Sequence, residues 1–191
     1  MRLGDVANEG AAQYGKPLDG VRVLAAEQMQ ALPYATQLLA RLGAEVVKVE
    51  HPAGGESGRG ATPAMTDPQG RSVGATFLRN NLSKRSVAID LKSPEGKKIF
   101  SELLTKVDVV VENFGPGVLD RFGFPWERVH EINPRIVQCT ISGYGMTGPY
   151  ETLASHGIAY DALTSDLNTA FLRPAKNVSV YCTGRILRAG R

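Results

Sequence analysis

The sequence predicts an α/β fold that is Rossmann-like, with a mostly parallel sheet and helices on both faces. Two observations favour this fold class. Short β-branched segments alternate with segments whose apolar residues recur at helical spacing. The segment 108–114 (DVVVENF) contains an uninterrupted apolar run, which is typical of a central parallel strand covered on both faces. A chain of 191 residues is also long enough to bury a substantial core.

The stretch 21–52 predicts a strand, a helix and a second strand, which form a βαβ unit with a right-handed crossover. The first strand begins at Val21, and the second covers 44–49. Pro33 fits the first turn of the helix, where its missing N–H would be unpaired anyway. Gly43 is expected to end the helix. The apolar face of the helix is predicted to contain Tyr34, Leu38, Leu39 and Leu42.

The segment 51–73 is rich in Gly, Pro and Ser, and its GGESGRG run lacks the spacing of a dinucleotide fingerprint. We therefore expect a mobile surface loop, although loops of this length are often functional. A strand is predicted at 84–91, with Lys84 and Arg85 in solvent. Ser93 is expected to cap the next helix, which starts at Pro94. The buried stripe of that helix is predicted to contain Ile99, Phe100, Leu103 and Leu104.

The polar turn that follows the strand at 108–114 is a candidate ligand site. Asn113 lies at the carboxyl end of this strand, where ligands of open α/β sheets bind. Short helices are predicted at 118–122 and 125–132, a strand at 135–145 and a further helix at 155–167.

The net charge of +3 does not indicate a nucleic-acid partner. Five of the 22 basic residues follow Asp166, where no acidic residue occurs, so 17 basic residues face 19 acidic ones in the rest of the chain. No apolar run is long enough to predict a membrane span. Cys139 and Cys182 are not ligand-spaced, which predicts reduced thiols in a cytoplasmic protein. Three scattered histidines predict no metal site.

Several segments match a known family pattern: 17–20 (PLDG), 43–50 (GAEVVKVE), 84–91 (KRSVAIDL), 111–117 (VENFGPG) and 141–150 (ISGYGMTGPY). With them the chain resembles the family III CoA-transferases (CaiB/BaiF type), which include formyl-CoA transferase and the α-methylacyl-CoA racemases. The resemblance extends to about Phe171. Leu32 departs from it, because the family often has Gly there. His51 departs as well, because many members have an Arg that reaches the nucleotide end of CoA.

The resemblance implies a CoA-transferase that moves CoA from an acyl-CoA thioester to a carboxylic acid acceptor through an aspartyl anhydride. Coenzyme A or acyl-CoA is then the substrate, no cofactor is permanently bound, and the intact family forms an interlaced homodimer. Matched positions imply CoA contacts for Gln30, Ala31, His51, Ile89, Lys92, Asn113, Phe114 and Arg121. Lys92 and Arg121 would attract the phosphates of CoA. Alternatively, both are solvated side chains and Phe114 belongs to the core.

Family members are about twice as long as this chain, and the resemblance implies that their catalytic Asp follows soon after Phe171. We therefore expect a loose extension at 1–16, the incomplete N-terminal CoA-transferase domain at 17–171, and a divergent basic tail at 172–191 for which a frameshift is one origin. Such a fragment is expected to be inactive, to expose an apolar patch, and to aggregate or pair abnormally.

Two alternatives stay open. A racemase-type isomerase would move an α-proton, with His156 near the place of that branch's catalytic His. A CoA-binding remnant would bind without turnover. Asp161 and Asp166 are expected to be helix-surface acids and not replacement nucleophiles. The sequence does not specify the donor and acceptor acids.

Overall fold

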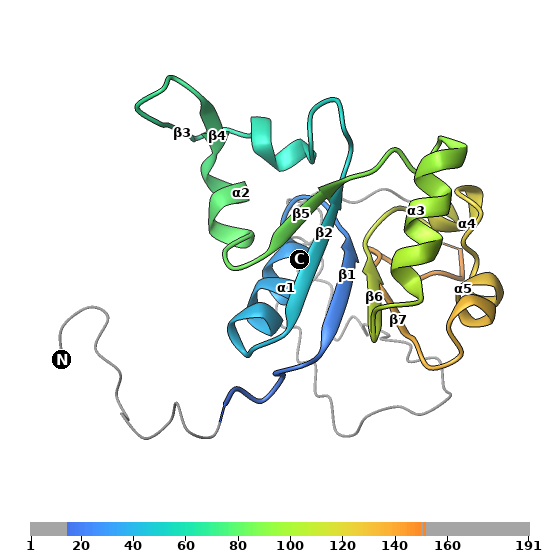
Figure 1. Ribbon diagram of the computed structural model, residues 1–191. Helices are drawn as coiled ribbons and strands as arrows, with labels where there is room; N and C mark the ends of the chain where they lie inside the picture. The colour runs from blue at the N-terminus through green and yellow to red at the C-terminus, as the bar shows by residue number, and fades with distance from the viewer. Residues whose placement is uncertain (1–14, 150, 152–191) are drawn as a thin grey trace, which may run out of the picture.

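A five-stranded parallel sheet organises the computed structural model, which describes residues 15–149 and 151 (Figure 1). Its strands lie in the order β5-β2-β1-β6-β7, and every neighbouring pair is parallel. Their bounds are β1 (Arg22–Ala26), β2 (Glu45–Glu50), β5 (Arg85–Ala88), β6 (Val109–Glu112) and β7 (Val137–Thr140). The predicted fold class is confirmed, although β5 and β7 are shorter than the predicted strands.

Helices cover both faces of the sheet. On β1, Leu24 packs into a core with α3 (Pro94–Leu104), α4 (Val118–Arg121) and α5 (Trp126–Ile132). Its neighbours Val23 and Ala25 point the other way, into a second core with α1 (Ala31–Arg41). Because successive strand residues face opposite sides of a sheet, the two cores lie on opposite faces. We refer to these two faces as the α3 face and the α1 face.

Helix α3 forms largely as its sequence predicts. The Oγ of Ser93 accepts a hydrogen bond from the backbone N–H of Gly96 at 2.9 Å, and Phe100 and Leu104 are fully buried. Gly96 lies against the backbone carbonyl of Asp90, so a Cβ at this position would clash. The prediction that Ile99 is buried is wrong, because its side chain is 46% exposed.

Helix α1 buries a different face from the predicted one. Tyr34, Leu38 and Leu42 are 54%, 39% and 46% exposed, and the buried positions are Leu32, Pro33, Thr36, Gln37 and Ala40. Thr36 explains part of the difference, because its Oγ1 donates to a buried carboxylate of Glu27 at 2.7 Å. Because α1 packs against a buried carboxylate, polar residues occupy part of its buried face. Gly43 ends the helix at φ +112°, as predicted.

The segment 51–73 is more than the surface loop that was expected. It contains a short 3₁₀ helix, η2 (Ser57–Gly60), and an antiparallel hairpin of β3 (Ala64–Thr66) and β4 (Ser72–Gly74). Glu56 and Gly58 are buried. The hairpin leads into α2 (Ala75–Asn80) and projects beyond β5 at the edge of the sheet (Figure 1). Ion pairs described below attach this segment to β2.

Some predictions lie outside the described residues. These are the tail at 172–191, most of the N-terminal extension, and the helix at 155–167 with His156, Asp161 and Asp166.

Candidate functional site

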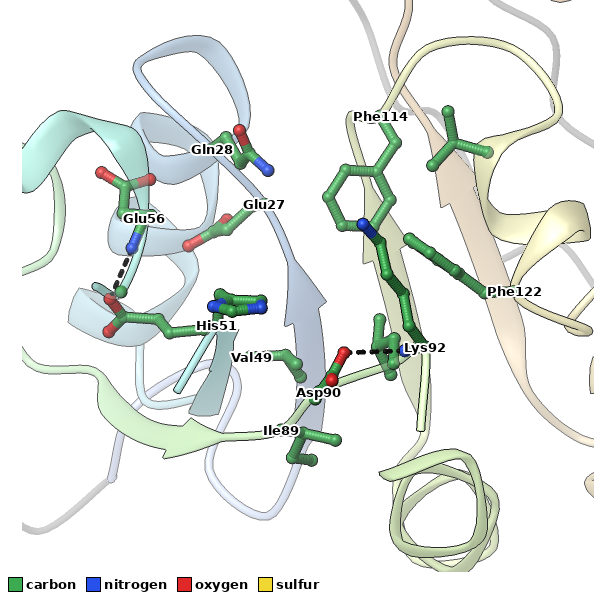
Figure 2. Close-up of a pocket in the computed structure, with 14 residues that line it drawn as sticks. Glu27, Gln28, Val49, His51, Glu56, Ile89, Asp90, Lys92, Phe114 and Phe122 are labelled. Atoms are coloured by element: carbon green, nitrogen blue, oxygen red, sulfur yellow. Dashed lines mark hydrogen bonds between the residues drawn. The ribbon is translucent and has the colours of Figure 1, made fainter. Parts of the chain in front are cut away.

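A pocket of about 190 Å³ opens at the carboxyl edge of the sheet (Figure 2). Strand order runs outward from β1 in both directions, to β2 and β5 on one side and to β6 and β7 on the other. In open α/β sheets this reversal leaves a crevice between the two central strands, here β1 and β6. The polar lining includes Glu27, Gln28, His51, Glu56, Asp90 and Lys92, and the apolar lining includes Val49, Ile89, Leu91, Phe114, Val118 and Phe122.

Four of the eight predicted CoA contacts line this pocket: His51, Ile89, Lys92 and Phe114. The Nδ1 of His51 accepts the backbone N–H of Ala53 at 3.1 Å, which leaves Nε2 to carry the proton of the neutral ring. Figure 2 shows the Lys92 side chain extending toward Phe114. The backbone N–H of Lys92 is held by Asp90 Oδ1 at 2.9 Å.

Asn113 lies beside the pocket and holds the turn between β1 and α1. Its Oδ1 accepts the backbone N–H of Gln28 at 2.8 Å, and its Nδ2 donates to the carbonyl of Gln28 at 2.9 Å. Both ends of the amide therefore bind backbone. This side chain joins the carboxyl ends of the two central strands.

The remaining three predicted residues lie elsewhere. Gln30 and Ala31 line a second cleft with Tyr34, Arg79 and Asn80. Arg121 is exposed and does not line either opening, with its guanidinium 3.5 Å from the carbonyl of Pro116.

A cluster of buried charges, two of which line the pocket, was not predicted. This buried ion cluster consists of Glu27, Lys48, Glu56 and Lys84, whose side chains are all 2% exposed or less. Lys48 Nζ lies 3.4 Å from Glu27 Oε1 and 3.1 Å from Glu56 Oε2, and Lys84 Nζ lies 2.6 Å from Glu27 Oε1. Two cations and two carboxylates balance one another. Buried charges require such pairing, because isolated ions are expensive to remove from water.

Lys84 is the clearest correction to the sequence analysis. It was expected in solvent, but its ammonium also donates to the carbonyl of Pro33 at 2.8 Å and to Asn81 Oδ1 at 3.0 Å. Burial lowers the pKa of Lys84 to about 8, and the nearby Glu27 carboxylate opposes that shift. Arg85 points the other way: it is exposed, as predicted, and pairs with Glu45 at 2.8 Å.

A second ion pair fixes the segment after β2. Arg59 binds Glu50 through two nitrogens, at 2.6 and 2.7 Å. Burial alone would raise the pKa of Glu50, but hydrogen bonds from Arg59, Ser86 and the backbone N–H of Glu56 lower it to about 2. The Arg59 guanidinium also lies 3.9 Å from the ring centroid of Phe77.

One sequence signal could have revealed part of this arrangement. Lys48 stands in the strand sequence EVVKVE two residues from Val46, so the alternation of side chains points it toward the α1 face. A lysine at a core-facing strand position needs a buried acid, and Glu27 at the end of the neighbouring strand supplies it.

Two further kinds of feature concern the described part of the chain, namely metal-holding side-chain groups and membrane-spanning helices. Within residues 15–149 and 151, no group of three or more His, Cys, Asp or Glu side chains is arranged to hold a metal ion. No helix in the same residues has the length and apolar character needed to cross a membrane.

Comparisons with known proteins agree on one family. The model of CoA-transferase family III matches residues 18–170. A formyl-CoA:oxalate CoA-transferase from Bradyrhizobium sp. (strain ORS 278) is 49% identical over 136 residues, which are 71% of this chain and 31% of that protein. The corresponding protein of Streptomyces coelicolor is 46% identical over 154 residues, 81% of this chain and 36% of that protein. This chain therefore spans about a third of the length of these curated relatives.

Solved structures give the same result. A CAIB/BAIF family protein from Brucella suis matches with a TM-score of 0.72 and 35% identity, over 87% of this chain and 44% of that chain.

Proposed function

The chain belongs to CoA-transferase family III, and from that premise we propose that its described domain binds coenzyme A, free or as an acyl-CoA thioester, at the carboxyl edge of the sheet. One observation carries the proposal. The pocket at the topological switch point brings together His51, Ile89, Lys92 and Phe114 from segments that are far apart in the sequence.

The chemistry of the pocket supports a nucleotide ligand. Ile89 and Phe114 offer apolar surface to an aromatic base, and Lys92 offers a cation to phosphate. Three of the carboxylates that line the pocket, Glu27, Glu50 and Glu56, repel an anionic ligand less because they are paired with Lys48, Lys84 or Arg59. The fourth, Asp90, accepts the backbone N–H of Lys92. Charge balance in the wall is therefore a condition for binding CoA here.

We assign the two openings to different ends of CoA. A pocket of about 190 Å³ holds one part of so long a ligand. Ile89 and Lys92 suit the nucleotide end, and the cleft at Gln30 and Ala31 suits the pantetheine end.

For the whole protein we propose CoA transfer from an acyl-CoA to a carboxylic acid. An aspartate attacks the thioester carbonyl, the C–S bond breaks, and CoA thiolate leaves behind an enzyme-bound anhydride. The thiolate then attacks the aspartyl carbonyl, which releases the donor acid and leaves an aspartyl–CoA thioester. The acceptor carboxylate attacks that thioester, which releases CoA thiolate and forms a second anhydride. The thiolate then attacks the acceptor carbonyl of this anhydride, which gives the acceptor CoA thioester and frees the aspartate.

Calorimetric titration of the full chain with CoA tests the binding proposal. We expect saturable binding and a roughly tenfold weaker affinity for Lys92→Ala, because a charge-assisted phosphate contact is worth about 1.5–3 kcal/mol. Lys98→Ala is the matched control, because Lys98 is an exposed lysine of α3 outside the pocket. Absence of CoA binding, or equal losses for the two variants, would contradict the proposal.

Product analysis tests the reaction. The names of the curated relatives suggest formyl-CoA and oxalate as the first substrate pair. Formation of oxalyl-CoA, detected by mass spectrometry, would support transfer. Deuterium exchange at the α-carbon of an acyl-CoA without transfer would favour the racemase alternative, and binding without either reaction would identify a non-catalytic CoA-binding chain.

A further inference from the structure

We propose that Glu56 is a positioning residue for the CoA site. Its carboxylate holds Met29 in the left-handed backbone conformation and thereby fixes the turn between the pocket and the second cleft. The ligand in this inference rests on the proposed function, whereas the geometry rests on the contacts described below.

Met29 is the strained point of the turn between β1 and α1. Its φ is +64°, in the left-handed region that residues with a side chain rarely adopt. The residue before it, Gln28, lines the pocket, and the residue after it, Gln30, lines the second cleft. The backbone angle of Met29 therefore sets how the two openings are oriented relative to each other.

Contacts on both sides of Met29 hold this conformation. Glu56 Oε2 accepts the backbone N–H of Met29 at 2.9 Å. Asn113 holds both backbone groups of Gln28, and Asn80 Nδ2 lies 3.5 Å from the Met29 carbonyl. Of these contacts, the one from Glu56 acts on the N–H of the strained residue itself.

The carboxylate is fixed from behind. Lys48 Nζ donates to the same oxygen, Oε2, at 3.1 Å, and Lys48 is itself held by the carbonyl of Glu27 at 3.2 Å. The other oxygen, Oε1, is buried without a hydrogen-bond partner in the described structure. A single oxygen atom thus joins the buried ion cluster to the strained turn.

Gly58 leaves room for this carboxylate. Oε1 of Glu56 contacts the position that a Cβ on Gly58 would occupy, so any side chain there displaces the carboxylate. Gly58→Ala therefore moves Glu56 without removing a charge from the buried ion cluster.

Five variants of the full chain, four single and one double, test the inference, with two measurements on each. Hydrogen exchange of the residue-29 amide by NMR reports the contact, and calorimetry reports the dissociation constant for CoA. Glu56→Ala removes the acceptor, and we expect loss of amide protection and at least tenfold weaker CoA binding. Glu56→Gln keeps an acceptor oxygen and should recover most of the affinity. Gly58→Ala should resemble Glu56→Ala, and exposed Glu131→Gln is the control.

The decisive variant combines Glu56→Ala with Met29→Gly. Glycine adopts positive φ without strain, so the turn no longer needs the carboxylate, and CoA affinity should return to within about threefold of the wild-type value. If Glu56 acts only through charge or general stability, Met29→Gly restores nothing and Glu56→Gln is as harmful as Glu56→Ala. That result would overturn the inference.

The two proposals fail in distinguishable ways. If the wild-type chain does not bind CoA, the proposed function fails, and amide exchange alone decides the positioning role. Unchanged protection of the Met29 amide in Glu56→Ala would then reject it, and lost protection would support it.

Discussion

The two faces of the sheet differ in the chemistry of their cores. On the α3 face the core is apolar except at the carboxyl end of β6, where Glu112 is buried, and Leu24, Phe100, Leu104 and Val110 are fully buried. On the α1 face the apolar core gives way, at the carboxyl edge, to the buried ion cluster and to Glu50 with Arg59. Both faces flank the same pocket.

This difference separates two tasks. Apolar packing is non-directional, so the α3 face can supply stability without setting the position of any one atom. Hydrogen bonds are directional, including those between charged groups, and they hold the segments around Gln28 and Glu56 at the pocket rim. We infer that the α3 face mainly stabilises the domain, and that the charged end of the α1 face mainly shapes the site.

The largest effect is expected from removing one ion of the buried ion cluster. Lys48→Met leaves two buried carboxylates with a single lysine and should lower the free energy of unfolding by about 3–5 kcal/mol. Adding Glu56→Gln restores the charge balance and should recover part of the loss. Urea denaturation measures both variants. A loss under 1 kcal/mol for Lys48→Met would show that the cluster is not tightly coupled to folding.

A cavity on the apolar face should cost somewhat less. Leu104→Ala removes a fully buried side chain of α3 and should destabilise the domain by about 3 kcal/mol without changing CoA affinity by more than twofold. Leu38→Ala is the control, since Leu38 is 39% exposed on α1. Similar losses for the two variants would contradict the contrast between the buried and exposed positions.

Acid should weaken the charged face selectively. The pKa of Glu50 is about 2 in the folded chain and 4.5 in its unperturbed state, so its contribution is complete above pH 4.5 and is lost as pH falls toward 2. This carboxylate contributes about 2 kcal/mol to the free energy of unfolding, a value reduced for solvent screening because Arg59 is partly exposed. Urea denaturation at pH 6, 4 and 3 should show this slope in the wild type and a weaker one in Glu50→Gln. Identical slopes would exclude Glu50 as the titrating group.

The smallest effect concerns the start of α3. Ser93→Ala removes the oxygen that caps Gly96 and should cost about 1 kcal/mol in thermal or urea denaturation. Ser101→Ala is a fair comparison, because the Ser101 hydroxyl donates inside the same helix, to the carbonyl of Lys97 at 2.9 Å. A greater loss for Ser101→Ala would show that capping is not what stabilises this helix.

Most of the fold could be predicted because local signals and tertiary packing agree there. Ser93, Pro94 and the buried Phe100 specify α3 in the sequence and in the structure alike. The run before Asn113 predicts a central strand, and β6 lies between β1 and β7. Binding positions at the ends of strands follow from the same topology, which is why His51 and Ile89 reach one pocket.

The prediction failed where a polar group is buried by a partner that is distant in the sequence. Lys84 looks like a surface lysine until Glu27, 57 residues away, is placed beside it. The buried stripe of α1 was misassigned for the same reason, because Thr36 faces Glu27. Hydrophobic periodicity considers only the positions of apolar residues. It cannot predict that a distant carboxylate will stabilise a polar side chain in the interior.

Strand order also has a consequence for how the chain acquires its structure. The central strand β1 is synthesised well before its partner β6, whose Val110 pairs with Leu24. On the ribosome, one edge of β1 stays unpaired while β2 and β5 assemble on the other. Such long-range parallel pairing slows folding, because the entropy cost of closing the loop comes before the stabilising contacts between the strands form. The hydrogen bonds between Gln28 and Asn113 bridge 85 residues, so this rim of the pocket forms only once β6 has docked.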